Sequence, residues 1–247
     1  MAGHSHWANI SRHKGVMDAK RGKVFSKLAR YIMIAARGGG GDPDMNLRLR
    51  YAIDKARSVS MPKENIERAV KKGTGELAGE TLEEITYEGY GPGGVAILVE
   101  TLTDNRNRTA GEIRSTFEKL GGNQGTPGCV SYLFDRKGLI LIDAKKYPVE
   151  DVVMEAALNA EADDFEPVDG VYEVTCDPAK FLTVQAALSA AGFDAMEAEI
   201  KNLPRTSVDV DVETGKKVMR LLDTLDNNDD VQTVYTNANI TEEMAAG

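Results

Sequence analysis

Cations near the start of the chain are spaced three, four and seven residues apart. Residues at these spacings share one side of a helix, and we expect a helix over residues 18–37. The stripe consists of Lys20, Lys23, Lys27, Arg30 and Arg37. It centres roughly 130° from the apolar face of the same helix, so its side chains are expected to point to solvent. Because Lys and Arg neutralise phosphates without recognising any base, the stripe predicts contact with a phosphate backbone.

The charge balance of the whole segment favours this interpretation over a merely solvated helix face. Residues 1–72 carry 16 Lys and Arg against 6 Asp and Glu, a net charge of +10, whereas the remaining residues carry 14 against 33. The net charge of −9 for the chain hides this positive field. Arg21 projects near the apolar face and is the least secure candidate. The candidate phosphate-binding residues are Lys14, Lys20, Arg21, Lys23, Lys27, Arg30, Arg48, Lys55, Lys71 and Lys72.

A second cationic motif, Asp104-Asn-Arg-Asn-Arg-Thr109, joins an expected strand to an expected helix. In this position Arg106 and Arg108 are able to fork onto a phosphate beside exposed backbone N–H groups. Helix capping and ion pairs with the acidic remainder of the chain are the alternative, and the residues alone support both equally. Both arginines are therefore candidate nucleic-acid-binding residues.

The histidines do not predict a metal site. His4, His6 and His13 have no cysteine or carboxylate at ligand spacing, so we assign them to a basic N-terminal arm. Trp7 is able to stack on a base, but anchoring this arm to the helical core is the favoured role.

No catalytic constellation is present either. The glycine-rich stretches at 38–41 and 121–128 lack the GK[ST] ending of a phosphate-binding loop, and the second is long enough to order against a partner. The acidic pairs at 163–164 and 229–230 fall at helix-to-strand turns, where Asp is common. A nucleic-acid hydrolase needs clustered carboxylates, a metal triad or a Ser/His/Asp set. We predict no enzyme activity, no metal and no cofactor.

The elements that must position these residues begin with three helices. Apolar residues recur at helical spacing over 18–37, 44–58 and 62–72, with Gly38–Gly41 as the first stop signal. Pro62 is tolerated in the first turn of the third helix. We predict a small, basic, three-helix domain over residues 1–75.

After a polar linker at 74–80 the pattern changes to strands and helices. Runs at 85–90 and 95–103 predict a hairpin around Gly91–Gly94, and the capping box Thr109–Glu112 predicts the start of a helix. A short strand is expected at 130–134.

From residue 139 the order strand, helix, strand, strand, helix, strand is the ferredoxin-like βαββαβ arrangement. A strand at 207–212, a helix at 214–225 and a strand at 231–236 are expected to complete the earlier half-sheet. We predict an α+β multidomain fold, with an N-terminal three-helix domain plus two α+β (ferredoxin-like) domains, one inserted in the other. Its discontinuous domain spans 76–134 and 204–247, and the inserted domain spans 135–203.

The apolar runs and the cysteines of the sequence indicate the cellular compartment in which the protein works. No apolar run approaches the 18 residues needed to cross a bilayer, and the first residues lack the apolar core of a signal peptide. Cys129 and Cys176 are far apart in the sequence, which fits a reducing compartment. We expect a cytoplasmic protein without membrane contact.

Several long motifs closely resemble the YebC/PmpR family, and the likeness covers essentially the whole chain. His6 departs from the family's usual opening, which has lysine there, so the charge at this position depends on pH. The motifs are Met1-Ala-Gly-His-Ser-His-Trp-Ala-Asn-Ile10, Asp18-Ala-Lys-Arg-Gly-Lys23, Gly39-Gly-Gly-Asp-Pro-Asp44, Leu49-Arg-Tyr-Ala-Ile-Asp-Lys-Ala56, Tyr87-Glu-Gly-Tyr-Gly-Pro-Gly-Gly94, Asp104-Asn-Arg-Asn-Arg-Thr109, Gly121-Gly-Asn123 and Met219-Arg-Leu-Leu222.

The resemblance implies three domains and a regulator of gene expression with no known reaction, and it favours the functional role of Arg106 and Arg108. Bacterial members are named as probable DNA-binding transcriptional regulators. The mitochondrial relative is a translational activator, and bacterial relatives are linked to the translation of proline-rich stretches. We expect a non-enzymatic regulator that contacts DNA or ribosomal RNA through residues 1–73.

The residues themselves lean toward RNA, because 62–72 is short for a recognition helix and no zipper-like segment indicates a dimer. The acidic α+β domains are expected to face a protein partner. An interaction scaffold that is merely anchored by its basic end is the remaining alternative.

Overall fold

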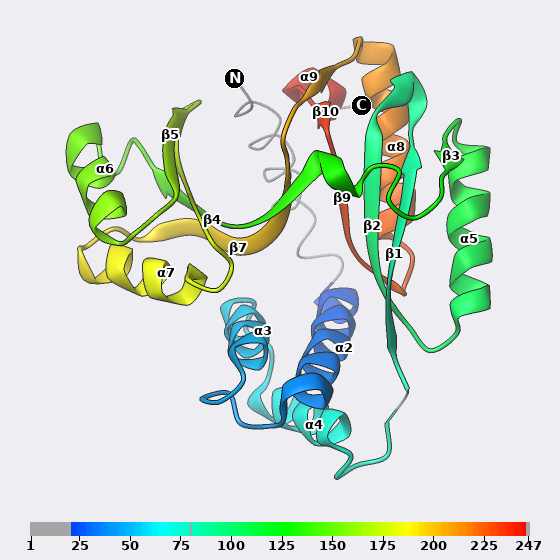
Figure 1. Cartoon of the computed structure of the whole chain (residues 1–247), viewed down its shortest axis with the longest axis horizontal. Coiled ribbons are helices and arrows are strands. Elements are labelled where there is room, and N and C mark those ends of the chain that lie inside the picture. Colours follow the sequence, from blue (N-terminus) through cyan, green and yellow to red (C-terminus); the bar gives the residue numbers. More distant parts are fainter. Residues whose placement is uncertain (1–20, 80, 246–247) are drawn as a thin grey trace. The chain divides into compact units, whose positions relative to one another are not determined.

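The computed structural model describes residues 21–79 and 81–245 (Figure 1). Helices are combined with sheets that are antiparallel apart from one two-stranded pair, which confirms the predicted α+β fold with a helical N-terminal region. The chain divides into two compact units. The first comprises residues 21–131 with Glu213–Thr236, and the second comprises Tyr132–Val212 with residues 237–245. Within the described ranges, no helix is both long and apolar enough to cross a membrane.

The first unit begins with three helices, α2 (Arg21–Gly39), α3 (Leu47–Ser58) and α4 (Lys63–Thr74). The three predicted helices are thus confirmed, with small shifts at their ends. α2 packs against both α3 and α4. Asn46 is the N-cap of α3, because its side chain accepts a hydrogen bond from the Leu49 N–H at 3.1 Å.

The same unit contains a four-stranded sheet in the order β3-β1-β2-β9. The predicted hairpin forms around the 3₁₀ turn η1 (Pro92–Gly94), and the last predicted strand pairs with β2. The strands are β1 (Glu83–Tyr90), β2 (Ala96–Thr103), β3 (Asn123–Gln124) and β9 (Val231–Thr236). The helices of this part are α5 (Arg106–Lys119) and α8 (Val212–Asp226).

Three local predictions in this region are wrong. α5 begins at Arg106 rather than at the predicted capping box, because Asn105 caps it and the Thr109 hydroxyl bonds elsewhere. Residues 131–133 form a 3₁₀ turn, η2 (Ser131–Leu133), in place of a strand. The strand predicted at 207–212 is reduced to β8 (Val208–Asp209), which pairs in parallel with β10 (Ala238–Asn239) and does not join the four-stranded sheet. The last helix is α9 (Glu242–Ala245).

The second unit is built on an antiparallel sheet in the order β5-β6-β4-β7. This is the strand order of the predicted ferredoxin-like arrangement, with a helix in each crossover. α7 lies close to the sheet at Gly138, where a Cβ would come within 2.6 Å of the Phe181 ring. The elements are β4 (Phe134–Asp143), α6 (Glu150–Asn159), β5 (Asp164–Val168), β6 (Val171–Cys176), α7 (Phe181–Ala190) and β7 (Ala195–Pro204).

Candidate nucleic-acid interface

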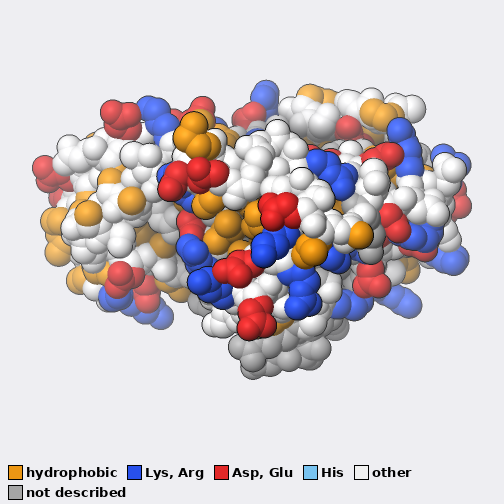
Figure 2. All heavy atoms as spheres, turned by 90° about the horizontal axis from the view of Figure 1, so that it is seen from below, with side chains coloured by type: hydrophobic (Ala, Val, Ile, Leu, Met, Phe, Trp, Pro, Cys, Tyr) orange, Lys and Arg blue, Asp and Glu red, His pale blue; other side chains and the backbone are white. Residues whose placement is uncertain are grey.

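Cations and acids are interleaved on the face drawn in Figure 2, where Lys and Arg side chains lie beside Asp and Glu side chains rather than in one continuous patch. Whether a predicted phosphate-binding residue is available therefore depends on the partner that it already has.

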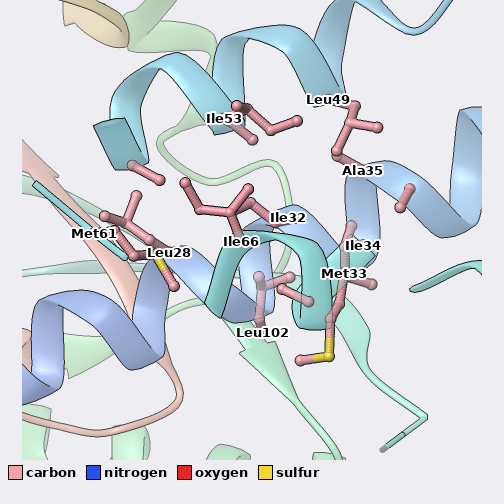
Figure 3. Packing of buried hydrophobic residues seen from close by; sticks show 14 of the residues in the cluster. Leu28, Ile32, Met33, Ile34, Ala35, Leu49, Ile53, Met61, Ile66 and Leu102 are labelled. Atoms are coloured by element: carbon pink, nitrogen blue, oxygen red, sulfur yellow. The ribbon is translucent and has the colours of Figure 1, made fainter. Parts of the chain in front are cut away.

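A shared apolar core fixes the three helices that carry the candidates. Ile32, Leu49 and Ile66, one from each helix, are buried and face one another (Figure 3). Leu82, just before β1, and Leu102 of β2 belong to the same cluster. The core of the helical region therefore continues onto the adjoining sheet.

Gly73 allows α4 to cross α2 closely. A Cβ at this position would lie 2.5 Å from the Met33 carbonyl oxygen and 2.7 Å from the Ala36 Cβ. Both distances are shorter than the van der Waals contacts of Cβ atoms in packed proteins. This crossing determines which side of α4 is buried and which side faces outward.

Three α2 cations, Lys23, Lys27 and Arg30, lie against residues 226–230, which we call the acidic loop. Lys27 Nζ lies 3.0 Å from an Asp226 carboxylate oxygen, and Lys23 and Arg30 each donate to a backbone carbonyl of this loop at 2.9 Å. The side chains of Lys27 and Arg30 are only 19% and 22% exposed. The expectation that the stripe points to solvent is wrong for these two residues, because helical spacing does not reveal a partner about 200 positions later in the chain.

The last carboxylate of the acidic loop, Asp230, is the centre of a buried polar cluster. Its oxygens accept bonds from Arg30 at 3.0 Å, Arg108 at 2.6 Å, Thr109 at 2.7 Å and Thr103 at 3.2 Å, and its side chain is 4% exposed. Burial raises the pKa of Asp230, but the bonds from Arg108 and Thr109 outweigh it, so the pKa is lowered. The carboxylate thus joins α2, β2 and the start of α5.

The motif at 104–109 is largely accounted for by this cluster. The Asn105 side chain accepts from the Arg108 N–H at 3.1 Å, and the Arg108 guanidinium also lies 2.8 Å from Asp104. Bonds to Asp230 and Asp104 raise the pKa of Arg108. Capping and ion pairing, the structural alternative considered for this motif, therefore describe Arg108. Arg106 is exposed, and its side chain has no hydrogen bond or ion pair with the described residues.

Arg48 is also held within the first unit. It forms a bidentate pair with Glu84, with one N–O distance of 3.0 Å, and its guanidinium lies 5.3 Å from the Tyr31 ring centroid. The bond to Glu84 raises the pKa of Arg48 although burial opposes it. Lys55 is half-buried on α3.

The outward side of α4 carries cations of a different kind. Arg68, Lys71 and Lys72 follow i, i+3, i+4 spacing, so they share one face. None of the three side chains has a hydrogen bond or ion pair with the residues in the described ranges. Lys71 and Lys72 were predicted from the sequence, whereas Arg68 was missed although its spacing from them was visible.

The remaining candidates lie outside the described residues. These are Lys14 and Lys20, together with the side chain of Arg21; the arm residues His4, His6, His13 and Trp7 fall in the same range.

A carboxylate anchors the end of the glycine-rich segment at 121–128 and the residues that directly follow it. Glu88 of β1 is 6% exposed and accepts bonds from the N–H groups of Gly128, Val130 and Ser131 at 2.7, 2.8 and 2.7 Å. Burial raises the pKa of Glu88, but these three hydrogen bonds together lower it by a larger amount. The pKa of Glu88 is therefore below its usual value. This segment, which the sequence indicated to be long enough to order against a partner, is therefore anchored at its end within the first unit.

A second buried carboxylate lies in the ferredoxin-like sheet. Glu173 of β6 is 7% exposed, and its Oε1 has no hydrogen-bond partner among the described residues. Burial, and then the charges of Glu166 and Asp169, raise the pKa of Glu173 to about 7. In the described part of the chain, no group of three His, Cys, Asp or Glu is placed to hold a metal ion.

Comparison with known proteins covers nearly the whole chain. Residues 5–76 match a family model described as the TACO1/YebC protein N-terminal domain, and residues 82–238 match one described as the TACO1/YebC second and third domain.

Full-length relatives give the same picture. The chain is 56% identical to a probable transcriptional regulatory protein of Geobacter sulfurreducens, over 99% of this chain and 98% of the relative. It is 53% identical to a protein of the same description from Rhodopirellula baltica, over the full length of both. Among solved structures, a conserved hypothetical protein from Aquifex aeolicus superposes with a TM-score of 0.81 at 48% identity, covering 92% of this chain and 93% of that one.

Proposed function

The chain belongs to the TACO1/YebC family, and from that premise we propose that it is a non-enzymatic regulator of gene expression that binds nucleic acid through its helical N-terminal domain. The basic character of residues 1–72, with a net charge of +10, supports an anionic partner. Its working compartment in this proposal is the cytoplasm, in keeping with two free cysteines.

One observation carries the choice of contact surface. Three α2 cations are engaged by the acidic loop, whereas Arg68, Lys71 and Lys72 present unengaged charge on one face of α4. Lys71 and Lys72 also lie in the last turn of α4, where cations stabilise the helix dipole, but that role does not need Arg68 in the middle of the helix. We therefore assign phosphate contact to this α4 face, with Arg106 as a separate contact candidate.

The names of the relatives support DNA as the ligand and transcription as the process. An RNA- or ribosome-associated translation factor, acting on proline-rich stretches, is the second candidate, and one feature of α4 favours it. Glu64 and Glu67 are exposed in the N-terminal half of α4. In a helix-turn-helix reader that half enters the major groove, where carboxylates are repelled by the flanking phosphates.

A matched pair of charge variants tests the contact surface. The triple variant Arg68→Gln, Lys71→Gln, Lys72→Gln is compared with Arg114→Gln, Lys119→Gln, Lys216→Gln, which removes three exposed cations elsewhere in the first unit. Binding to a structured ribosomal RNA fragment and to duplex DNA is measured by fluorescence polarisation over a salt series. We expect the α4 variant alone to lose affinity at least tenfold, and its salt slope to fall by about 2 to 3. Equal losses in the two variants would contradict the α4 assignment, and no binding by the unmodified chain would contradict the proposed function.

Crosslinking in cells followed by sequencing of the bound nucleic acid decides between the two ligands. Predominant ribosomal RNA would support the translation factor, and discrete promoter fragments would support the transcriptional regulator.

A further inference from the structure

The helix pair of the ferredoxin-like part, α6 and α7, borders an apolar groove that the proposed function does not use. The groove has a volume of about 310 Å³. Val152 and Ala156 line it from α6, Ala187 and Ala191 line it from α7 and its end, and Phe193 closes it. The groove lies wholly within the second unit.

α6 exposes far more apolar surface than a helix covering a sheet needs. Val153 and Ala157 are buried and account for its attachment. Val149, Val152 and Leu158 are nevertheless 59%, 52% and 63% exposed. A helix that is apolar on several sides is typical of a buried helix. Of these three side chains Val152 lines the groove, so the groove side of α6 carries an exposed apolar side chain without cover in the second unit.

The charged residues near the α6–α7 groove indicate which kind of partner would cover it. Neither α6 nor α7 contains a Lys or Arg, Glu155 of α6 lines the groove, and Asp151 lies one helical turn before Glu155 on the same side of α6. The lysines near the two helices, Lys146 and Lys180, are each paired with a carboxylate of the same unit at 2.7 Å. A second copy of this surface would bring like charges together, which costs free energy. The acidic edge of the groove on α6 therefore favours a partner that carries cations.

We propose that the α6–α7 groove binds an amphipathic helix of a protein partner, whose apolar stripe is flanked by Lys and Arg. The apolar side chains of such a helix would pack on Val152, Ala156 and Phe193, and its cations would pair with Asp151 and Glu155. In helix-in-groove recognition an amphipathic helix lays its apolar face into a hydrophobic groove. This inference does not depend on nucleic-acid binding.

Two synthetic peptides test the groove on the full chain. Both carry leucines at helical i, i+3, i+4, i+7 spacing. One has Lys at all remaining positions, and the other has Glu at those positions. We expect the Lys peptide to bind in a fluorescence polarisation assay and the Glu peptide not to bind. Val152→Ser should weaken binding at least fivefold and Ala156→Lys should abolish it. Leu158→Ser, an equally exposed change on α6 outside the groove lining, should leave binding unchanged. Equal binding of both peptides, no binding of either, or equal effects of Val152→Ser and Leu158→Ser would overturn the proposal.

Photocrosslinking identifies the occupant in cells. A benzophenone side chain at position 152 is expected to crosslink to a Lys- and Arg-rich amphipathic segment of another protein, identified by mass spectrometry of the joined peptides. Crosslinks to nucleic acid, to a second copy of this chain or to acidic segments would overturn the proposal, as would the absence of any crosslink.

Discussion

Replacing Glu173 by Gln is expected to stabilise the second unit, by an amount that grows as the pH rises from 4 to 8. Glu173 lies opposite Glu166 in the register of β5 and β6, and the charge of Lys201 acts to lower the pKa of Glu173 without offsetting its rise. Its carboxylate is buried, and its Oε1 has no hydrogen-bond partner in the described part of the chain. Gln keeps the shape and the hydrogen-bonding capacity of the protonated acid but cannot ionise.

The sign and size of the change in the free energy of unfolding follow from the pKa of Glu173, which rises from 4.5 to about 7 on folding. Between these two values the folded chain keeps a proton that the unfolded chain has released, so stability falls as the pH rises through this window and levels off above it. At 1.36 kcal/mol for each tenfold change in the acid constant, the full penalty is about 3 kcal/mol. The advantage of Glu173→Gln should therefore grow from near zero at pH 4 to about 3 kcal/mol at pH 8.

Urea unfolding at pH 4, 5, 6, 7 and 8 measures this difference, with hydrogen exchange of peptides from β4 and β6 reporting the second unit separately. Glu166→Gln is the matched control. It removes one neighbouring charge but leaves Glu173 buried, so it should give a smaller gain. An advantage of Glu173→Gln that is independent of pH, or that is absent at pH 8, would refute the reasoning, because Glu173 would then ionise without penalty.

Three further changes test the first unit. Asp230→Asn should lower the free energy of unfolding by about 2 kcal/mol at pH 7, whereas Asp229→Asn, at a carboxylate 78% exposed, should change it by less than about 0.5 kcal/mol in the same urea titration. Because the pKa of Asp230 is lowered on folding, its contribution should be complete above the usual carboxyl pKa and lost as the pH falls below it; equal effects of the two variants would contradict the cluster. Glu88→Gln should speed hydrogen exchange in the anchored glycine-rich segment, and unchanged exchange rates there would show that the anchor is not needed. Gly73→Ala should cost about 2 to 3 kcal/mol by separating α2 from α4, while Gly22→Ala, with open space around its Cβ, should stabilise α2 by about 0.5 kcal/mol in thermal unfolding; a neutral Gly73→Ala would contradict the close crossing.

The elements of this fold were accessible from the sequence because their signals are local. Apolar periodicity predicted the helices now seen as α2, α3 and α4, and turn residues predicted the β1–β2 hairpin. Local signals did not choose between two caps for α5: Asn105 and Thr109 both suit an N-cap, and the Thr109 hydroxyl instead bonds to Asp230.

The candidate site was harder to predict because cation spacing describes a helix and not its partner. Lys27 and Arg30 were predicted to be solvent-facing phosphate ligands, yet they lie against acids that are remote in the sequence. The acidic pair at 229–230 was predicted as ordinary turn chemistry, and only the folded arrangement shows that Asp230 is buried among cations and hydroxyls.

The pairing of α2 with the acidic loop has a consequence for how the chain folds while it is being synthesised. Arg30 and Asp230 are separated by 200 positions, and β9, which follows directly, completes the sheet that Leu102 links to the helical core. During synthesis from the N-terminus, Lys23, Lys27 and Arg30 do not meet their partners in the acidic loop until nearly the whole chain has emerged. We therefore expect the first unit to close late, through its last-made segment, because such long-range closure is slow compared with the formation of its helices.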